Sequence, residues 1–186
     1  MAITRQGLTL EQFLKLPERE PALEYADGVV TQKVAPKARH SRLQYKLAEW
    51  FNRWAEPRRL AFAFPELRTT YSGRSYVPDI AVYRRERISR NAKGEPEDEV
   101  FEPPDIAVEI VSPGQGIPAL ILKCRWYVEH GVLIALLVNP DDYSVRRFEP
   151  GRELLLRGAD VIDMDAVLPG LHATADEWFA MLRPGW

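Results

Sequence analysis

Apolar residues recur with helical spacing in two long stretches of the chain. Between residues 40 and 54 they fall at intervals of three and four, which predicts an amphipathic helix that Pro57 ends. A second apolar stripe follows residues 117–128 and stops at Gly131, where a helix commonly ends. Two shorter helices are predicted at residues 9–16, with Thr9 as the N-cap, and at residues 176–182.

The remaining apolar segments are short and rich in β-branched and aromatic residues, which is typical of strands. The continuous apolar run at 132–138 suits a buried central strand. Further strands are predicted at 29–34, at 61–64 or 67–71, and at 76–83, 104–112 and 143–148, with a polar surface insertion at 84–101. The order strand, helix, strand over residues 104–138 has the length of a parallel crossover. We therefore expect an α/β fold with helices against a central mixed sheet.

Composition describes an ordinary globular chain. Its 186 residues suit a single domain over residues 1–186, with 46% apolar and 28% charged residues. A net charge of −2 gives no argument for nucleic-acid binding, so any basic surface would have to be local. One cysteine, Cys124, excludes an internal disulfide. A cytoplasmic protein without a signal peptide or a membrane-spanning segment is expected.

Two acids interrupt apolar strand sequences, where an unpaired carboxylate would be costly to bury. Asp79 lies in the predicted strand 76–83 and Glu109 in the predicted strand 104–112. Alternation places each acid on the same face as a small neighbour, Ala81 or Ala107, which leaves room for a ligand. If the strands are neighbours, the acids converge, and their hard oxygen atoms suit Mg²⁺ or Mn²⁺. Taken singly, each acid fits an edge-strand or salt-bridged residue equally well.

Lys123 follows the Glu109 strand on the second long helix. Helical spacing places it at the margin of the apolar stripe, and spacing alone favours an ammonium group that reaches water. The functional alternative is that this ammonium group orients an attacking water or stabilises a phosphate. His40, near the start of the first long helix, could serve as a general base or a phosphate ligand, but a helix N-terminal residue without a catalytic part is the favoured interpretation.

Several short motifs together resemble a known family. They are Leu23-Glu24-Tyr25-Ala26-Asp27-Gly28, Arg39-His40-Ser41, Val77-Pro78-Asp79, the segment 105–113 and Lys123-Cys124-Arg125-Trp126-Tyr127 followed by His130-Gly131-Val132. In order and spacing they resemble the Uma2 family of the PD-(D/E)XK, restriction-endonuclease-like superfamily, from about residue 8 to the C-terminus. No single motif is specific, but their arrangement is.

The resemblance implies an αβββαβ-type core and Mg²⁺-dependent hydrolysis of phosphodiester bonds. Asp79 and Glu109 match the metal-binding acids of the family. The usual lysine position, two residues after the second acid, is Val111 here, and Lys123 matches the variant in which the lysine lies on the following helix. Glu24 and Glu66 are further candidate acids near the metal, with ordinary surface charge as the alternative interpretation, favoured for Glu66.

The leading hypothesis is an endonuclease that acts on DNA with Mg²⁺, or Mn²⁺, through Asp79, Glu109 and Lys123. A homodimer is expected because cutting both strands favours two sites related by a two-fold axis. One alternative is a catalytically weak or inactive module of the same fold that binds nucleic acid or metal. Val29 motivates it, since many family members carry an acid at that position. Another alternative is a nuclease that acts on RNA or branched substrates.

Overall fold

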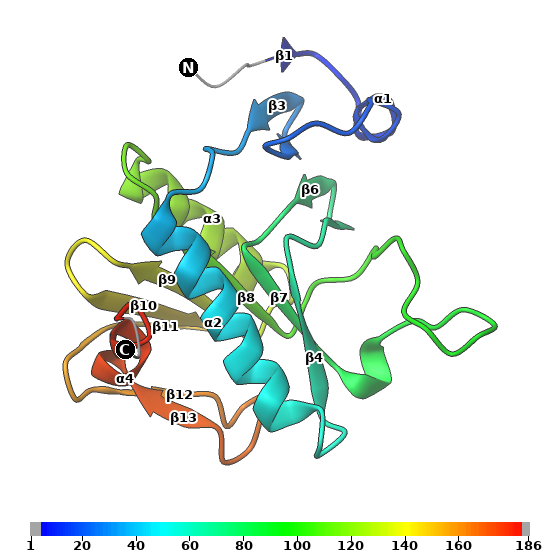
Figure 1. The fold of residues 1–186 in the computed structure, drawn as a ribbon. Helices are drawn as coiled ribbons and strands as arrows, with labels where there is room; N and C mark the ends of the chain where they lie inside the picture. The colour runs from blue at the N-terminus through cyan, green and yellow to red at the C-terminus, as the bar shows by residue number, and fades with distance from the viewer. Residues whose placement is uncertain (1–4, 184–186) are drawn as a thin grey trace.

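The computed structural model describes residues 5–183, so residues 1–4 and 184–186 of the predicted 1–186 domain lie outside the described part. Six strands form the larger sheet in the order β11-β10-β9-β8-β7-β4 (Figure 1). Their bounds are β4 Ala61–Pro65, β7 Ile80–Arg84, β8 Ile106–Ile110, β9 Ile134–Asn139, β10 Ser144–Glu149 and β11 Arg152–Arg157.

The larger sheet is mixed, as the sequence predicts. Strands β8 and β9 are parallel, with Ile106 opposite Ile134, and α3 (Ile117–Glu129) makes the crossover between them. The other pairings in this sheet are antiparallel, including β7 with β8, where Ile80 lies opposite Val108. The condition set by the sequence, that the two segments carrying Asp79 and Glu109 are neighbours, is therefore met.

Two helices cover opposite faces of this sheet. Helix α2 (Ala38–Ala55) buries Leu43, Leu47 and Phe51 against the face that carries Ile80 and its alternating neighbours. Helix α3 packs on the other face, where the small side chains of the central strands and its own aromatic residues form a second core. Complete burial of one leucine-sized side chain contributes about 1.5–3 kcal/mol, so these two interfaces account for much of the stability.

A smaller antiparallel sheet, in the order β1-β3-β2-β6-β5, lies across one end of the molecule (Figure 1). Its strands are β1 Arg5–Gln6, β2 Leu23–Ala26, β3 Val29–Gln32, β5 Thr69–Tyr71 and β6 Arg74–Tyr76. Helix α1 (Leu10–Leu14) packs Phe13 against Tyr25 of this sheet and begins at the predicted Thr9 cap. Residues 77–79 lead directly from β6 into β7, so they join the two sheets.

The C-terminal part covers the α2 side of the larger sheet. It contains β12 (Val161–Asp163), β13 (His172–Thr174) and α4 (Ala175–Ala180), and it buries Ile162 and Trp178. The segment predicted as a surface insertion starts with the short 3-10 helix η1 (Arg85–Arg87). In residues 5–183, none of the helices combines the length and the apolar character that a bilayer crossing requires.

Several predicted boundaries are wrong. The strand expected at 76–83 is two strands, because the chain leaves the smaller sheet after Tyr76 and joins the larger one at Ile80. Pro78 lies in the break, where its lack of a backbone N–H costs no ladder hydrogen bond. Asp79 therefore precedes β7 and does not lie inside a strand. Both alternatives at 61–64 and 67–71 form strands, and the strand expected to reach residue 34 ends at Gln32.

Candidate active site

Asp79 lies at the junction of the two sheets and is 2% exposed. Its Oδ2 accepts a hydrogen bond of 2.6 Å from the Ile110 backbone N–H on β8, which fixes the carboxylate beside that strand. Its Oδ1 lies 2.7 Å from Lys33 Nζ and 3.4 Å from His40 Nε2. Burial alone would raise the pKa of Asp79, but His40 and Lys33 outweigh it and hold this pKa well below its usual range. The carboxylate is therefore ionised and fully partnered.

Glu109 lies on β8, on the face that α3 covers, and is almost completely buried. The Tyr127 hydroxyl donates a hydrogen bond of 2.7 Å to Glu109 Oε1, and Lys123 Nζ lies 2.8 Å from the same oxygen. Burial is the largest influence on the pKa of Glu109 and raises it, with Lys123 opposing and Asp79 adding to the shift. A second cation near this carboxylate would favour its ionised form.

Lys123 lies in the interior, contrary to the expectation from helical spacing. Its side chain is 10% exposed, and Nζ lies 2.7 Å from Glu24 Oε1 as well as 2.8 Å from Glu109. The aromatic rings of Tyr76 and Tyr127 lie 5.0 and 5.8 Å from the ammonium group. The expectation of a solvated ammonium group is wrong because strand β6 of the smaller sheet covers this side of α3. Tertiary packing of that kind leaves no mark on the helical periodicity.

Glu24 and Glu66 both belong to this cluster, but they differ in exposure. Glu24 on β2 is buried, and its Oε1 accepts the Val77 backbone N–H at 2.9 Å in addition to Lys123. Glu66 follows β4 and has a side chain 43% exposed, yet it lies 2.9 Å from Lys33 Nζ and 2.8 Å from Gln44 Nε2. Glu66 is thus exposed, as surface charge would be, but it also shares the Lys33 ammonium group with Asp79.

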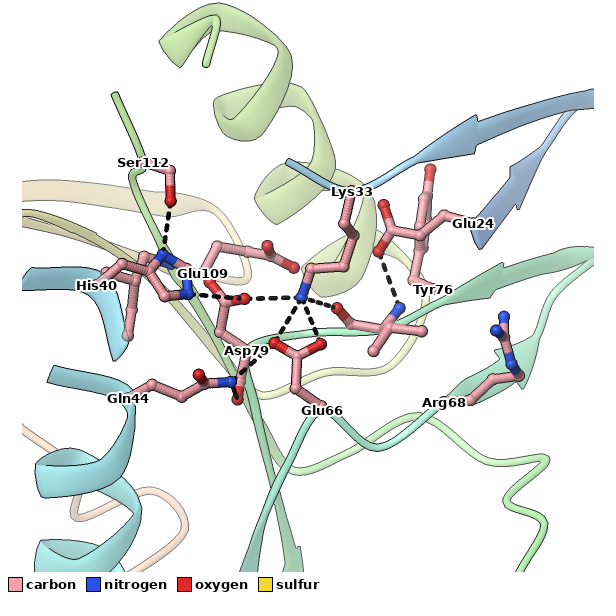
Figure 2. A network of polar contacts seen from close by, with 12 residues as sticks. Glu24, Lys33, His40, Gln44, Glu66, Arg68, Tyr76, Asp79, Glu109 and Ser112 are labelled. Carbon is pink, nitrogen blue, oxygen red and sulfur yellow. Dashed lines mark hydrogen bonds and ion pairs between the residues drawn. The ribbon is translucent and has the colours of Figure 1, made fainter. Parts of the chain in front are cut away.

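Sequence reasoning missed Lys33 and undervalued His40. Lys33 follows β3 in a segment without regular spacing, so no pattern marks it, whereas the Arg39-His40-Ser41 motif could have pointed to His40. His40 is buried, and its Nδ1 lies 2.9 Å from Ser112 Oγ while Nε2 faces Asp79 (Figure 2). Burial opposes protonation of the imidazole, but Asp79 prevails and raises the pKa of His40.

The donor set fits a hard divalent cation. Among the described residues, His40, Glu66 and Asp79 each offer a ligand atom, and these atoms lie within 4.8 Å of one another. The wider cluster adds the carboxylates of Glu24 and Glu109. These carboxylates contact two ammonium groups, and Asp79 also faces His40, whose pKa is raised, so positive charge within the cluster offsets part of the negative charge. Among the described residues, the grouped ligand atoms thus include the predicted Asp79 and Glu66 together with His40, whereas Glu109 lies outside this group.

The chain is similar to proteins that are described as putative nucleases. The model of the Uma2 family, described as "Putative restriction endonuclease", matches residues 10–176. A solved structure from Anabaena variabilis ATCC 29413, described as "a putative nuclease belonging to DUF820", superposes with a TM-score of 0.90 at 34% sequence identity. That similarity covers 95% of this chain and 99% of the other. A search of curated proteins finds no match. On the family match and this structural relative, the chain belongs to the Uma2 family.

Proposed function

We propose that this protein is a metal-dependent nuclease that hydrolyses phosphodiester bonds of DNA through Asp79, Glu109 and Lys123. The observation that carries the proposal is that Asp79 and Glu109 are both buried at neighbouring positions, where Asp79 accepts the backbone N–H of Ile110, the residue after Glu109, and Glu109 is paired with Lys123. Each isolated buried charge would destabilise the fold by several kcal/mol. A cluster of this composition in the family's matching positions is better explained by chemistry than by stability.

Asp79 and Glu109 are the residues that would hold Mg²⁺ or Mn²⁺, with Glu66 and His40 as neighbouring donors. Carboxylate oxygens are the ligands these ions prefer, and the ligand atoms of Asp79, Glu66 and His40 lie within 4.8 Å of one another. When bound, such an ion stabilises negative charge on the phosphate and lowers the pKa of a coordinated water. The Ile110 backbone N–H and the imidazole of His40 hold the Asp79 carboxylate in position.

Lys123 acts as a hydrogen-bond donor and a positive charge, not as a base. Burial would lower its pKa, but Glu109 and Glu24 outweigh burial and raise it, so the ammonium group keeps its proton. A protonated amine at this place orients the attacking water or stabilises the charge that develops on the phosphate. Glu24 and the aromatic rings of Tyr76 and Tyr127 fix its position.

Cleavage of supercoiled plasmid in the presence of Mg²⁺ or Mn²⁺ tests this proposal, with single-stranded DNA, branched DNA and RNA as parallel substrates. Asp79→Asn, Glu109→Gln and Lys123→Met should each lower the cleavage rate by at least about 10²-fold, the usual effect of removing one electrostatic contact to the transition state. Lys15→Met, which removes an exposed lysine on α1, is the matched control and should cleave like the wild type.

The outcomes separate the alternatives. Cleavage confined to RNA or branched DNA would show that the protein is a nuclease for those substrates and not for duplex DNA. A wild type that is inert on every substrate would favour the binding module, and variants that cut as fast as the wild type would exclude this site. The expected homodimer stays a prediction, which sedimentation of the intact protein can test.

A further inference from the structure

Lys33 occupies a position in the cluster that resembles a cation-binding site. Its Nζ lies 2.7 Å from Asp79 Oδ1, 2.9 Å from the Val77 carbonyl oxygen, and 2.9 and 3.1 Å from the two carboxylate oxygens of Glu66 (Figure 2). Four oxygen atoms from three residues thus surround one positive charge. Two carboxylates and a backbone carbonyl are also a typical ligand set for a hard divalent ion.

The atoms that hold Lys33 are those that a metal ion at this place would need. Asp79 and Glu66 are two of the three residues whose ligand atoms lie within 4.8 Å of one another, and Lys33 binds both of them. An ammonium group and a divalent cation that shared Asp79 Oδ1 would repel each other at short range in a poorly screened site. Occupation by one therefore opposes occupation by the other.

The two lysines of the cluster have equally exposed side chains, 10% each, but their partners differ. Lys123 is held between Glu24 and Glu109 beneath two aromatic rings. Lys33 lies next to Glu66, whose side chain is 43% exposed, whereas the side chains of the two acids that hold Lys123 are 11% and 4% exposed. The Lys33 backbone N–H is bonded to the Ala22 carbonyl oxygen at 2.9 Å, which anchors the main chain, and the rotatable bonds of the four-carbon stem give the ammonium group a means to move.

We propose that Lys33 is a built-in counterion that competes with the divalent metal, so that metal binding displaces its ammonium group from Asp79 and Glu66. Without metal, Lys33 neutralises the acids and keeps them in place. Because the metal must displace Lys33, the apparent metal affinity of the site is lower, and a higher concentration of free divalent ion is needed to fill the site. This inference rests on the metal site of the proposed function but not on the reaction that the site performs.

Isothermal titration with MnCl₂ tests the competition on the intact protein. Lys33→Met keeps an unbranched side chain and removes the charge, so it should bind Mn²⁺ at least about tenfold more tightly than the wild type, as expected for losing a like charge at this range. Lys37→Met, four residues away on the exposed side of the same segment, should bind like the wild type. Equal or weaker Mn²⁺ binding by Lys33→Met would overturn the inference.

A second measurement uses the wild type alone and stays informative if Lys33→Met does not fold. Brief acetylation of lysines, read by mass spectrometry with and without Mn²⁺, reports the accessibility of each ammonium group. Labelling of Lys33 should increase severalfold when Mn²⁺ is added, while labelling of Lys37 stays constant. Unchanged or reduced labelling of Lys33 at saturating Mn²⁺ would overturn the inference.

The two proposals fail in different ways. Tighter Mn²⁺ binding by Lys33→Met together with a wild type that cleaves no nucleic acid would support the competition and refute the nuclease. Metal-dependent cleavage by the wild type together with unchanged Mn²⁺ binding by Lys33→Met would do the reverse. If neither protein binds Mn²⁺, the competition and the metal site are both refuted.

Discussion

Removing the hydroxyl group of Tyr127 perturbs the cluster by one atom. The Tyr127 hydroxyl donates its hydrogen bond to Glu109 Oε1 at 2.7 Å, and both side chains are buried. Tyr127→Phe keeps the ring and its packing against Tyr76 and Trp126, so it opens no large cavity. The variant therefore isolates the energetic contribution of one donor to a buried carboxylate.

The structure sets the expected size of the effect. A hydrogen bond to a charged group contributes about 1.5–3 kcal/mol to stability, and loss of a donor leaves the acceptor with an unmet desolvation cost. Lys123 stays 2.8 Å from the same oxygen, so the lower part of that range applies. We expect a loss of about 2 kcal/mol in the free energy of unfolding, which lowers Tm by roughly 4–8 °C for a chain of this size.

Scanning calorimetry and urea unfolding in metal-free buffer at about pH 8.5, above the pKa of about 7 to which burial raises Glu109, measure this loss. Tyr45→Phe is the matched control, because Tyr45 is 64% exposed and its replacement should change stability by less than about 0.5 kcal/mol. A Tyr127→Phe variant as stable as the wild type would show that Glu109 does not depend on this donor. The described pairing of Glu109 would then be wrong.

Three further changes have defined outcomes. Asp79→Asn should lower the free energy of unfolding by about 3 kcal/mol in metal-free buffer, since it breaks a buried ion pair. Thr174→Ala removes the N-cap of α4 and should cost about 1 kcal/mol by urea unfolding. Burial raises the pKa of Glu153, but hydrogen bonds from Arg125 and Arg146 outweigh burial and lower this pKa. The ionised Glu153 side chain therefore stabilises the fold above the ordinary glutamate pKa, and this stabilisation is lost as pH falls through the lowered pKa. Glu153→Gln should lower Tm at pH 7 and leave Tm unchanged in strong acid.

For each of these three predictions, one result would contradict the stated physical reason. An Asp79→Asn variant with unchanged stability would mean that the carboxylate is not paired as described. A Thr174→Ala variant equal to the wild type would show that the cap adds nothing beyond the packing of α4. A Tm deficit of Glu153→Gln that persists unchanged at the lowest pH would assign its effect to packing and not to charge.

Periodicity predicted the elements whose burial is regular along the chain. Helices α2 and α3 and strands β8 and β9 pack one continuous apolar surface, so their sequences carry the matching spacing. Strand β2 was missed because it has four residues and carries Glu24 in its interior. Strands at the edge of a sheet, such as β11 with its charged ends, bury too little for alternation to appear.

The candidate site was predictable only in part. Asp79 and Glu109 stand out because acids in apolar segments require partners, and those partners turn out to be Lys33, His40, Tyr127 and Lys123. Periodicity assigns Lys123 to water, and no local pattern marks Lys33. Their burial depends on the smaller sheet folding over the larger one, and contacts between segments so distant in sequence cannot be inferred from the spacing of residues within either.

Diffraction from crystals soaked in MnCl₂, collected near the manganese absorption edge, tests most directly whether these acids form a metal centre. We expect an anomalous peak at ligand distance from the Asp79 and Glu109 carboxylates, with Lys33 Nζ moved away from Asp79 Oδ1. Crystals at saturating Mn²⁺ with no peak at Asp79, and with Lys33 still paired to it, would refute the metal centre.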